Sequence, residues 1–379
     1  MGGIAIQPRA ATGQDAPRFL EAAPAEAVGP QARIAPLRKP AGFTPAVQRW
    51  SFLLPADAAG LRIVFFGAQA ANPEALEHHP MRDWVRAHLV GHPSGPSCVD
   101  YAQSRLASGH VEQIICAYWV SEADFGAWWT DASAQAWWDA PERLEGAYGS
   151  WREVLGVPRD RQESIYWKDY PAGLMRCPEV ELFPTPYCGY YGAMRDRIPL
   201  AAADPLDTPL SGAPVPHADR AGFGERWRVH VPANLAVIRS ANTWGRMDGE
   251  QLADYETKLR VPLEAGMDFL AQNPLPTGCL SMRWQGTLTP DGAPVPEEHA
   301  LAYFLSLRHM ERWAEGHATH AAIFGAAIQR YAHYGAANQL RTWHEVYVLP
   351  EGGQHFEYIN CAPDTGLLQW FEAERLSPA

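Results

Sequence analysis

The sequence predicts an α+β fold made of two duplicated ferredoxin-like halves, in which helices flank antiparallel sheets. The first observation behind this prediction is an internal repeat, because residues 117–121 read AYWVS and residues 302–306 read AYFLS, 185 positions later in a chain of 379 residues. In both copies a strand pattern ends in Ser, which often begins a helix, and a Trp follows seven residues after that Ser. A repeated strand–helix–strand order indicates a duplication.

The second observation is that several strand patterns follow one another without a helix between them. Apolar and alternating runs predict strands at 61–70, 117–121, 163–170, 234–241, 279–286, 342–349 and 355–362. Helical spacing predicts helices at 73–89 and 249–273, and Pro262 is expected to kink or split the second one. Adjacent strands favour an antiparallel sheet with helices on one face over a doubly wound parallel sheet.

Composition divides the chain into three segments. Residues 1–45 are rich in Ala and Pro and are expected to form an arm, partly disordered or laid across the surface or a partner subunit. Residues 46–225 form the first half with a linker, and residues 226–379 form the second half. The Pro-, Ala- and Gly-rich stretch 198–224 is expected to be that linker or a cover over a site.

Charge and motif content exclude several classes of protein. The 31 basic and 43 acidic residues give a net charge of −12, which argues against a nucleic-acid partner. No apolar run approaches the ~18 residues of a membrane helix, and the first residues lack the pattern of a secretory signal. The six scattered cysteines contain no C-x-x-C pair and fit reduced thiols in a cytoplasmic protein. No G-x-G-x-x-G or P-loop supports nucleotide binding.

Two histidines lie three residues apart in EGHATHAAIF, residues 315–324. His317 and His320 could be a core pair, a metal pair, or one histidine that faces a flat group. A zinc pair lacks a nearby third ligand. On a helix His320 would have small neighbours, Gly316 and Ala321 among them, which leave clearance for a planar cofactor such as haem.

Two further side chains could carry chemistry from strands. In RTWHEVYVL, His344 shares a strand face with Val346 and Val348, so it is either a core histidine or a general acid in a dry pocket. Ser240 ends the strand AVIRS on the face of Ile238, either as a turn residue or as a hydrogen-bond partner of a substrate hydroxyl.

Two arginines, Arg195 and Arg197, lie in YYGAMRDRIP. An Arg–Asp–Arg run is usually a local ion-pair cluster, but one guanidinium could point inward. A buried arginine needs an acid, and Glu163 at the start of a strand is a candidate.

Six segments, taken together and in order, resemble the haem-containing aldoxime dehydratases. They are YYGAMRDRIP, NLAVIRS, EAGMDFL, MERWAEGHATHAAIF, WHEVYV and FEYINCAPDTG, and the resemblance covers roughly residues 45–370. It implies ferredoxin-like halves of the dimeric α+β barrel type, with haem in the C-terminal half, and a homodimer. The implied reaction converts an aldoxime, R–CH=N–OH, into a nitrile and water on ferrous b-type haem.

The resemblance also assigns roles to residues of this chain. It implies that His320 is the proximal iron ligand and that His344 is the distal acid and base. It maps the partner of the oxime hydroxyl to Ser240, the supporting arginine to Arg195, and an acid that supports this arginine to Glu163.

Other functions remain open from the residues alone. A haem peroxidase or a chlorite-dismutase-like enzyme would use ferric iron with peroxide or an oxyanion. A haem carrier or sensor would have no turnover, and a structural protein would hold no metal.

Overall fold

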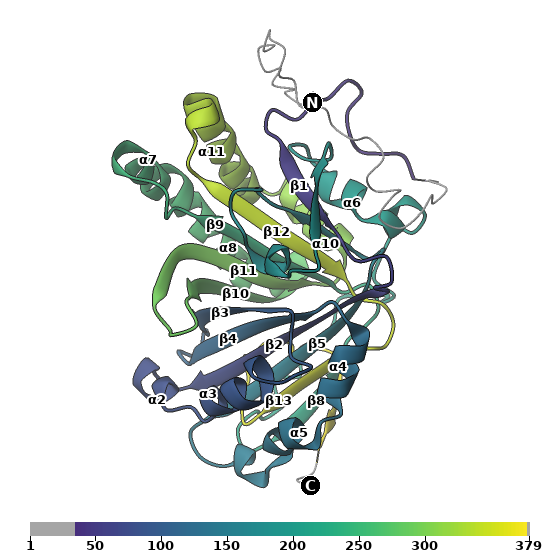
Figure 1. The fold of residues 1–379 in the computed structure, drawn as a ribbon, viewed down its shortest axis with the longest axis vertical. Helices are drawn as coiled ribbons and strands as arrows, with labels where there is room; N and C mark the ends of the chain where they lie inside the picture. Colours follow the sequence, from purple (N-terminus) through teal and green to yellow (C-terminus); the bar gives the residue numbers. More distant parts are fainter. Residues whose placement is uncertain (1–34, 377–379) are drawn as a thin grey trace.

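The computed structural model describes residues 35–376 as strands that form antiparallel sheets, with helices packed against them (Figure 1). The strands are β1 (Arg49–Leu53), β2 (Gly60–Ala70), β3 (Cys98–Arg105), β4 (Val111–Trp119), β5 (Gly149–Pro158), β6 (Gln162–Ile165), β7 (Glu181–Thr185), β8 (Arg226–His230), β9 (Ala236–Thr243), β10 (Cys279–Leu288), β11 (Pro294–Phe304), β12 (Arg341–Val348), β13 (His355–Ile359) and β14 (Glu372–Arg375). The predicted α+β class with antiparallel sheets is confirmed.

The helices are short apart from two. They are α2 (Pro73–Glu77), α3 (Met81–Trp84), α4 (Glu122–Trp129), α5 (Ala132–Asp139), α6 (Ala193–Arg197), α7 (Gly249–Asp254), α8 (Val261–Gln272), α9 (Pro274–Thr277), α10 (Leu307–Gly316) and α11 (Ala318–Tyr334). Two π-helical turns are η1 (Val85–Val90) and η5 (Tyr255–Arg260). The 3₁₀ turns are η2 (Pro141–Leu144), η3 (Gly173–Arg176), η4 (Pro199–Ala202) and η6 (Gly335–Ala337).

Twelve strands are hydrogen-bonded into one sheet in the order β14-β8-β13-β5-β2-β4-β3-β10-β11-β9-β12-β6, and β1 pairs with β7 apart from it. Within residues 35–376 the end strands β14 and β6 do not pair with each other, so this chain does not close a barrel. The run β2, helices, β3, β4, helices, β5 has the same order as the run β9, helices, β10, β11, helices, β12. We call β2–β5 with their helices the first run, and β9–β12 with their helices the second run. The two runs meet where β3 pairs with β10.

Strands also cross between the two runs. The short strand β6 follows β5 in sequence but pairs with β12, at the far edge of the sheet. In the other direction β13, near the C-terminus, pairs with β5. The pairing of β6 with β12 brings residues near 163 beside residues near 345, which are far apart in sequence.

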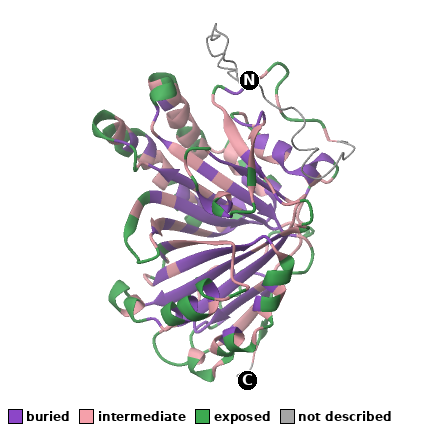
Figure 2. Cartoon of the chain, viewed as in Figure 1, coloured by how far each residue is buried: buried purple, intermediate pink, exposed green. Residues whose placement is uncertain are grey.

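The inner face of the sheet holds a polar network inside an apolar core, and buried residues follow the strands (Figure 2). The hydroxyl of Tyr118 donates to Glu345 at 2.7 Å, and the hydroxyl of Tyr303 donates to Glu153 at 2.5 Å. The two tyrosines are 185 residues apart and the two glutamates 192. Each contact therefore joins one run to the other, and the two contacts are reciprocal.

Two tryptophans make equivalent hydrogen bonds, one within each run and neither between the runs. The indole of Trp151 donates to Glu112 at 2.8 Å, and the indole of Trp343 donates to Glu297 at 3.0 Å. These glutamates are again 185 residues apart. All four side chains are buried, so the hydrogen bonds satisfy polar groups that water does not reach.

The outer face of the sheet is the face on which the helices pack, and it is filled differently in the two runs. On the first run, aromatic rings fill the space between sheet and helices, and Trp84, Trp128 and Trp138 pack around Phe66 with ring centroids 5.3–5.9 Å away. On the second run, α11 is apolar over much of its length, yet Arg330 is its one buried residue. The second outer face therefore has less protein packed on it.

Two predicted helices are interrupted. The segment 73–89 splits into α2, α3 and the π turn η1, and the segment 249–273 splits into α7, η5 and α8. Pro262 directly follows the π turn η5, and the backbone stays helical from residue 249 to residue 272. The helix therefore changes its hydrogen-bonding pattern before the proline but does not end there.

The predicted N-terminal arm falls mostly outside the described residues, which begin at residue 35. The part that is described runs along α6, where the backbone N–H groups of Arg38 and Lys39 donate to Asp196 at 3.0 Å. Among residues 35–376 no helix is both long enough and apolar enough to cross a membrane.

Replacing Trp128 by Ala should destabilise the protein by about 3–5 kcal/mol, because a fully buried indole leaves a cavity. Its ring nitrogen also donates to the His88 carbonyl at 2.6 Å. Urea unfolding followed by far-UV circular dichroism measures the change. Trp129→Ala is the matched control, because the side chain of Trp129 is only partly buried and its removal should cost less than half as much. Equal losses would contradict a dominant role of Trp128 in this packing.

Candidate active site

The candidate site lies on the outer face of the second run, where β9 and β12 pair. The register places His344 directly opposite Ser240. Val346 and Ile238, two residues along each strand, belong to the outer apolar cluster, whereas Trp343 belongs to the inner core. The predicted faces of both strands are therefore confirmed.

His344 is held through one ring nitrogen. Its Nε2 lies 2.9 Å from a terminal nitrogen of Arg197 and 3.0 Å from Oε1 of Glu163. Arg197 in turn donates from Nε to Oε2 of Glu163 at 2.6 Å and also donates to the carbonyl of Tyr187. Strand β6 makes this possible, because its Ile165 pairs with His344 and brings Glu163 alongside.

This arrangement gives the imidazole a partner in either protonation state. When Nε2 carries no proton it accepts from Arg197, which can only donate, and when it carries one it faces the carboxylate of Glu163. Among the described residues Nδ1 has no hydrogen-bond partner, and a quarter of the side chain (25 %) is exposed. Nδ1 is therefore the nitrogen free to exchange a proton with a ligand.

Glu163 remains ionised in this setting. Burial raises the pKa of its carboxyl group, but the Arg197 guanidinium and His344 lower it by more, so the net pKa lies below its ordinary value. The side chains of Glu163 and Arg197 are 0 % and 4 % exposed, and a buried pair of this kind is strongly destabilised when one partner is removed.

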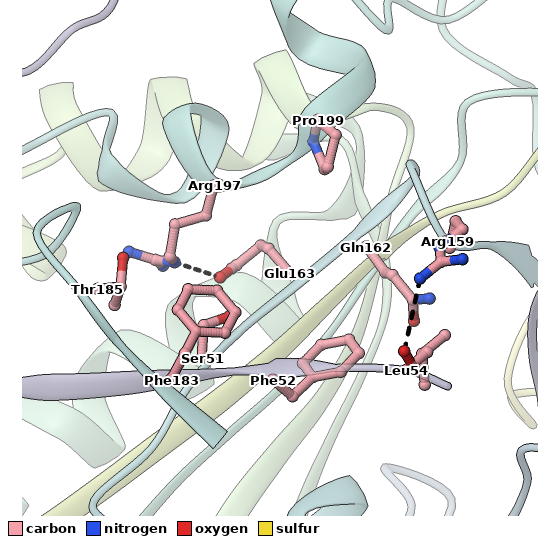
Figure 3. Close-up of a pocket in the computed structure, with 10 residues that line it drawn as sticks. All are labelled: Ser51, Phe52, Leu54, Arg159, Gln162, Glu163, Phe183, Thr185, Arg197 and Pro199. Atoms are coloured by element: carbon pink, nitrogen blue, oxygen red, sulfur yellow. Dashed lines mark hydrogen bonds and ion pairs between the residues drawn. The ribbon is translucent and has the colours of Figure 1, made fainter. Parts of the chain in front are cut away.

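A small hollow adjoins this ion pair (Figure 3). In the close-up, Glu163 and Arg197 meet on one side of it and the rings of Phe52 and Phe183 lie on another. The remaining lining comes from Ser51, Leu54, Arg159, Gln162, Thr185 and Pro199. Neither Ser240 nor His344 lines it, so the hollow is a separate space beside the pair.

Arg195 lies elsewhere. It forms a two-pronged ion pair with Glu311 of α10, with both N···O distances at 2.8 Å, and borders a different surface hollow together with Arg38 and Arg312. The expectation that Glu163 supports Arg195 is thus corrected, because its partner is Arg197. Both arginines are on the short helix α6, where residues two apart point about 200° from each other and cannot share a target.

The histidine pair is divided between two helices. Helix α10 ends at Gly316 and α11 begins at Ala318, so the expected single helix through both histidines is wrong. His317 is the junction, and its ring accepts from the backbone N–H of Thr319 as an N-cap. Its ring also stacks on Phe269 with centroids 4.1 Å apart. His317 therefore has a structural explanation that needs no metal.

His320 has no such explanation. Trp313 meets its ring edge-on at 4.8 Å, and Nδ1 is buried without a hydrogen bond of good geometry. Burial lowers the pKa of this imidazole, and the Ala314 carbonyl opposes the shift only in part. A neutral imidazole is the form that ligates iron.

Small residues follow His320 on α11. Ala321 and Ala322 are exposed although α11 is apolar, and a Cβ added at Gly325 would meet nothing within 4 Å. Within residues 35–376 no three His, Cys, Asp or Glu side chains gather as a metal-ion site. The donor set therefore suits a cofactor that needs a single histidine, as haem does, better than a bare metal ion.

A profile of the haem-containing dehydratases matches residues 64–367. The chain belongs to this family. Haem is therefore its cofactor, in agreement with the expectation from sequence. Over 340 residues the chain is 31 % identical to phenylacetaldoxime dehydratase of Bacillus sp. (strain OxB-1), covering 89 % of this chain and 95 % of that protein. Over 307 residues it is 32 % identical to aliphatic aldoxime dehydratase of Pseudomonas chlororaphis, covering 81 % and 85 %.

Solved structures of haem-containing dehydratases match the fold. One aldoxime dehydratase superposes with a TM-score of 0.80 at 28 % identity, covering 90 % of this chain and 96 % of that one. A second, in complex with butyraldoxime, gives 0.81 at 28 % identity and covers 90 % and 94 %.

Replacing His320 by Ala should remove haem from the purified protein, because we expect the His320 imidazole to be the iron ligand. The Soret absorbance per polypeptide, after expression with added haem precursor, measures the loss. His317→Ala is the matched control and should keep haem while lowering the thermal midpoint, since it removes a helix cap worth about 1 kcal/mol. Loss of haem from His317→Ala but not from His320→Ala would contradict the assignment.

Proposed function

We propose that this chain dehydrates aldoximes, R–CH=N–OH, to nitriles and water, with His344 as the acid and base. The single observation that carries the proposal is the imidazole fixed at Nε2 by Arg197 and Glu163, with Nδ1 free, opposite Ser240. The relatives named phenylacetaldoxime and aliphatic aldoxime dehydratases support the substrate class.

The reaction needs one proton delivered and one removed. Hydroxide is a poor leaving group, so the oxime oxygen takes a proton from His344 as the N–O bond breaks. The same imidazole then takes the proton from the carbon, which completes the nitrile and returns the histidine to its starting state. Imidazole is the side chain suited to both steps near neutral pH.

The neighbouring groups aim the reaction. Ser240 hydrogen-bonds the oxime hydroxyl and holds it toward His344, because the two residues are opposite partners in the ladder. Arg197 and Glu163 fix the imidazole plane through both proton transfers. Arg197 takes the supporting role that the sequence assigned to Arg195.

We place the haem against α11 in the C-terminal half, with His320 as the proximal ligand. The support is the contrast between the two outer faces: tryptophans fill the first, while α11 on the second leaves apolar residues uncovered. When bound in its ferrous b-type form, the haem supplies a binding point for the oxime nitrogen and electron density to the N–O bond.

We further propose that residues 46–225 and 226–379 are duplicated ferredoxin-like halves of the dimeric α+β barrel type. The support is the common element order of the two runs and the reciprocal contacts of Tyr118 with Glu345 and Tyr303 with Glu153. A homodimer, a cytoplasmic location and an arm at residues 1–45 remain predictions from the resemblance and composition.

The function is tested by incubating the dithionite-reduced haem protein, without oxygen, with alkyl and aryl aldoximes and measuring nitrile by gas chromatography. Nitrile should form with the ferrous protein and fall sharply with the ferric protein. A parallel arm offers hydrogen peroxide with a phenolic dye. Dye oxidation without nitrile from any aldoxime would overturn the proposal in favour of a peroxidase.

His344→Ala should lower kcat by about 10²–10⁴-fold while the Soret band is retained, because general acid–base catalysis is lost and the haem ligand is not. Ser240→Ala should cost less, about 10-fold, since it removes alignment but leaves the proton donor. Equal losses in the two variants, at equal haem content, would count against the separate roles.

Arg197→Lys and Arg195→Lys form a matched pair on one short helix. The Arg197→Lys variant keeps the positive charge, but an ammonium group cannot reproduce the fork that contacts Glu163 and His344 at the same time. We therefore expect kcat to fall at least 10-fold and the pH profile of kcat to shift. Lys at 195 should leave kcat within about two-fold, because Glu311 is its partner. The opposite ranking would restore the role to Arg195.

A further inference from the structure

Two cysteine sulfurs meet on the inner side of the first run, outside the candidate active site. The Sγ atoms of Cys98 and Cys177 lie 2.7 Å apart, and a disulfide bond is about 2.05 Å long, so the sulfurs need to move by less than about 1 Å to bond. We propose that this pair is a redox modification site: the two thiols form a reversible disulfide by exchange with a small-molecule disulfide of the glutathione type.

The pair differs from the other cysteines of the chain. Cys98 begins strand β3 and is partly exposed, whereas Cys177 directly follows the turn η3 and is buried. The two are 79 residues apart in sequence. The other four cysteines are buried, and none of their sulfurs contacts another sulfur among the described residues: Cys116, Cys188, Cys279 and Cys361. The sequence alone gave no sign of this pair, because no C-x-x-C spacing marks it.

The charges around the pair give the two thiols different roles. Arg176 lies next to Cys177 in sequence; burial lowers the pKa of its guanidinium, but Asp100 and then the Cys98 sulfur raise it by more. Asp100 already pairs with Arg176 at 2.9 Å. The hydrogen bond to Cys98, burial, and the nearby Glu179 all raise the pKa of the Cys177 thiol. Cys98, which is also the accessible one, is therefore the attacking thiol and Cys177 the resolving thiol.

The exchange balances without any further reactant. The Cys98 thiolate attacks one sulfur of the small disulfide RSSR, forms a Cys98–SR mixed disulfide, and releases RS⁻. Cys177 then loses its proton and attacks the Cys98 sulfur, and the second RS⁻ leaves. The sum is two cysteine thiols and RSSR giving one protein disulfide and two RSH, so the cysteines are oxidised and the small disulfide is reduced.

The disulfide would fasten the turn η3 to strand β3. The Cys98 thiol already donates to the Gly173 carbonyl at 3.7 Å, and the next residue, Leu174, donates its backbone N–H to the buried Glu345 at 2.7 Å. The bond closes a loop of about 80 residues, which restricts the unfolded chain. Because the contacts of η3 are already made, oxidation stabilises the protein without moving the face that carries His344.

The test uses the haem-loaded protein, first reduced with dithiothreitol and then freed of it. It is incubated anaerobically with glutathione disulfide, denatured, and its free thiols are counted with Ellman's reagent. The count should fall from six to four, and peptide mapping should find Cys98 linked to Cys177. The thermal midpoint of the oxidised protein should rise by roughly 2–5 °C. Dithiothreitol should reverse both changes.

Matched variants separate this pair from the other cysteines. Cys188→Ser removes a thiol that contacts only backbone carbonyls, and it should lose two of its five remaining thiols as wild type does. Cys98→Ser should keep all five. Six thiols after incubation, a lasting glutathione adduct on Cys98 alone, or a linkage between other cysteines would overturn the proposal. Peptide mapping of the wild type decides the matter even if a variant fails to fold, and no outcome depends on aldoxime turnover.

Discussion

The placement of His344 depends on a buried carboxylate beside it in the sequence. Glu345 is fully buried, and its two oxygens accept four hydrogen bonds at 2.7–2.8 Å, from the hydroxyls of Tyr118, Tyr166 and Tyr347 and from the backbone N–H of Leu174. Such charge-assisted bonds each contribute about 1.5–3 kcal/mol, and burying the carboxylate without them costs several kcal/mol. Since strand neighbours point to opposite faces, a Glu345 held inside forces His344 outside.

This constraint fixes the register of the whole strand. A slip of β12 by one residue would turn Glu345 to the outer face and His344 into the core, and every other side chain would change faces with them. The same register sets Ser240 opposite His344 and Ile165 on the other side, which in turn brings Glu163 within reach. The interior network therefore determines the geometry of a site that it does not touch.

The two runs show how one strand–helix order can serve two purposes. In the first run Arg152 occupies the position that precedes the buried Glu153, as His344 precedes Glu345, and its guanidinium lies 4.7–4.8 Å from the rings of Trp129 and Trp138. The buried rings of Phe66, Trp84, Trp128 and Trp138 also pack on that outer face. In the second run small residues stand on α11 instead, and Ala321 and Ala322 are exposed. Many of the tryptophans thus fill the outer face of the first run, and the sequence count alone could not assign them.

Much of the candidate site could be predicted from the sequence because its rules are local. Alternation within 342–349 and 234–241 was enough to place His344 and Ser240 on the outer face. Which of the two arginines pairs with Glu163 could not be predicted in the same way. The answer depends on the five-residue helix α6, which points Arg195 and Arg197 in different directions. It also depends on the pairing of β6 with β12, which places Glu163 at the far edge of the sheet. Neither leaves a periodic signal in the sequence.

The break between α10 and α11 has a similar origin, and it separates the two histidines. His317 leaves the helical conformation and caps α11, so α11 starts a new axis and His320 falls in its first turn. The first turn of a helix has N–H groups without helical partners, and side chains there are less crowded by a preceding turn. Trp313 of α10 packs against the His320 ring on the N-terminal side, whereas small residues, Ala321 and Gly325 among them, follow His320 on α11. The spacing of HATH separates a capping histidine from one that is free to bind, which explains why two histidines three apart need not act as a pair.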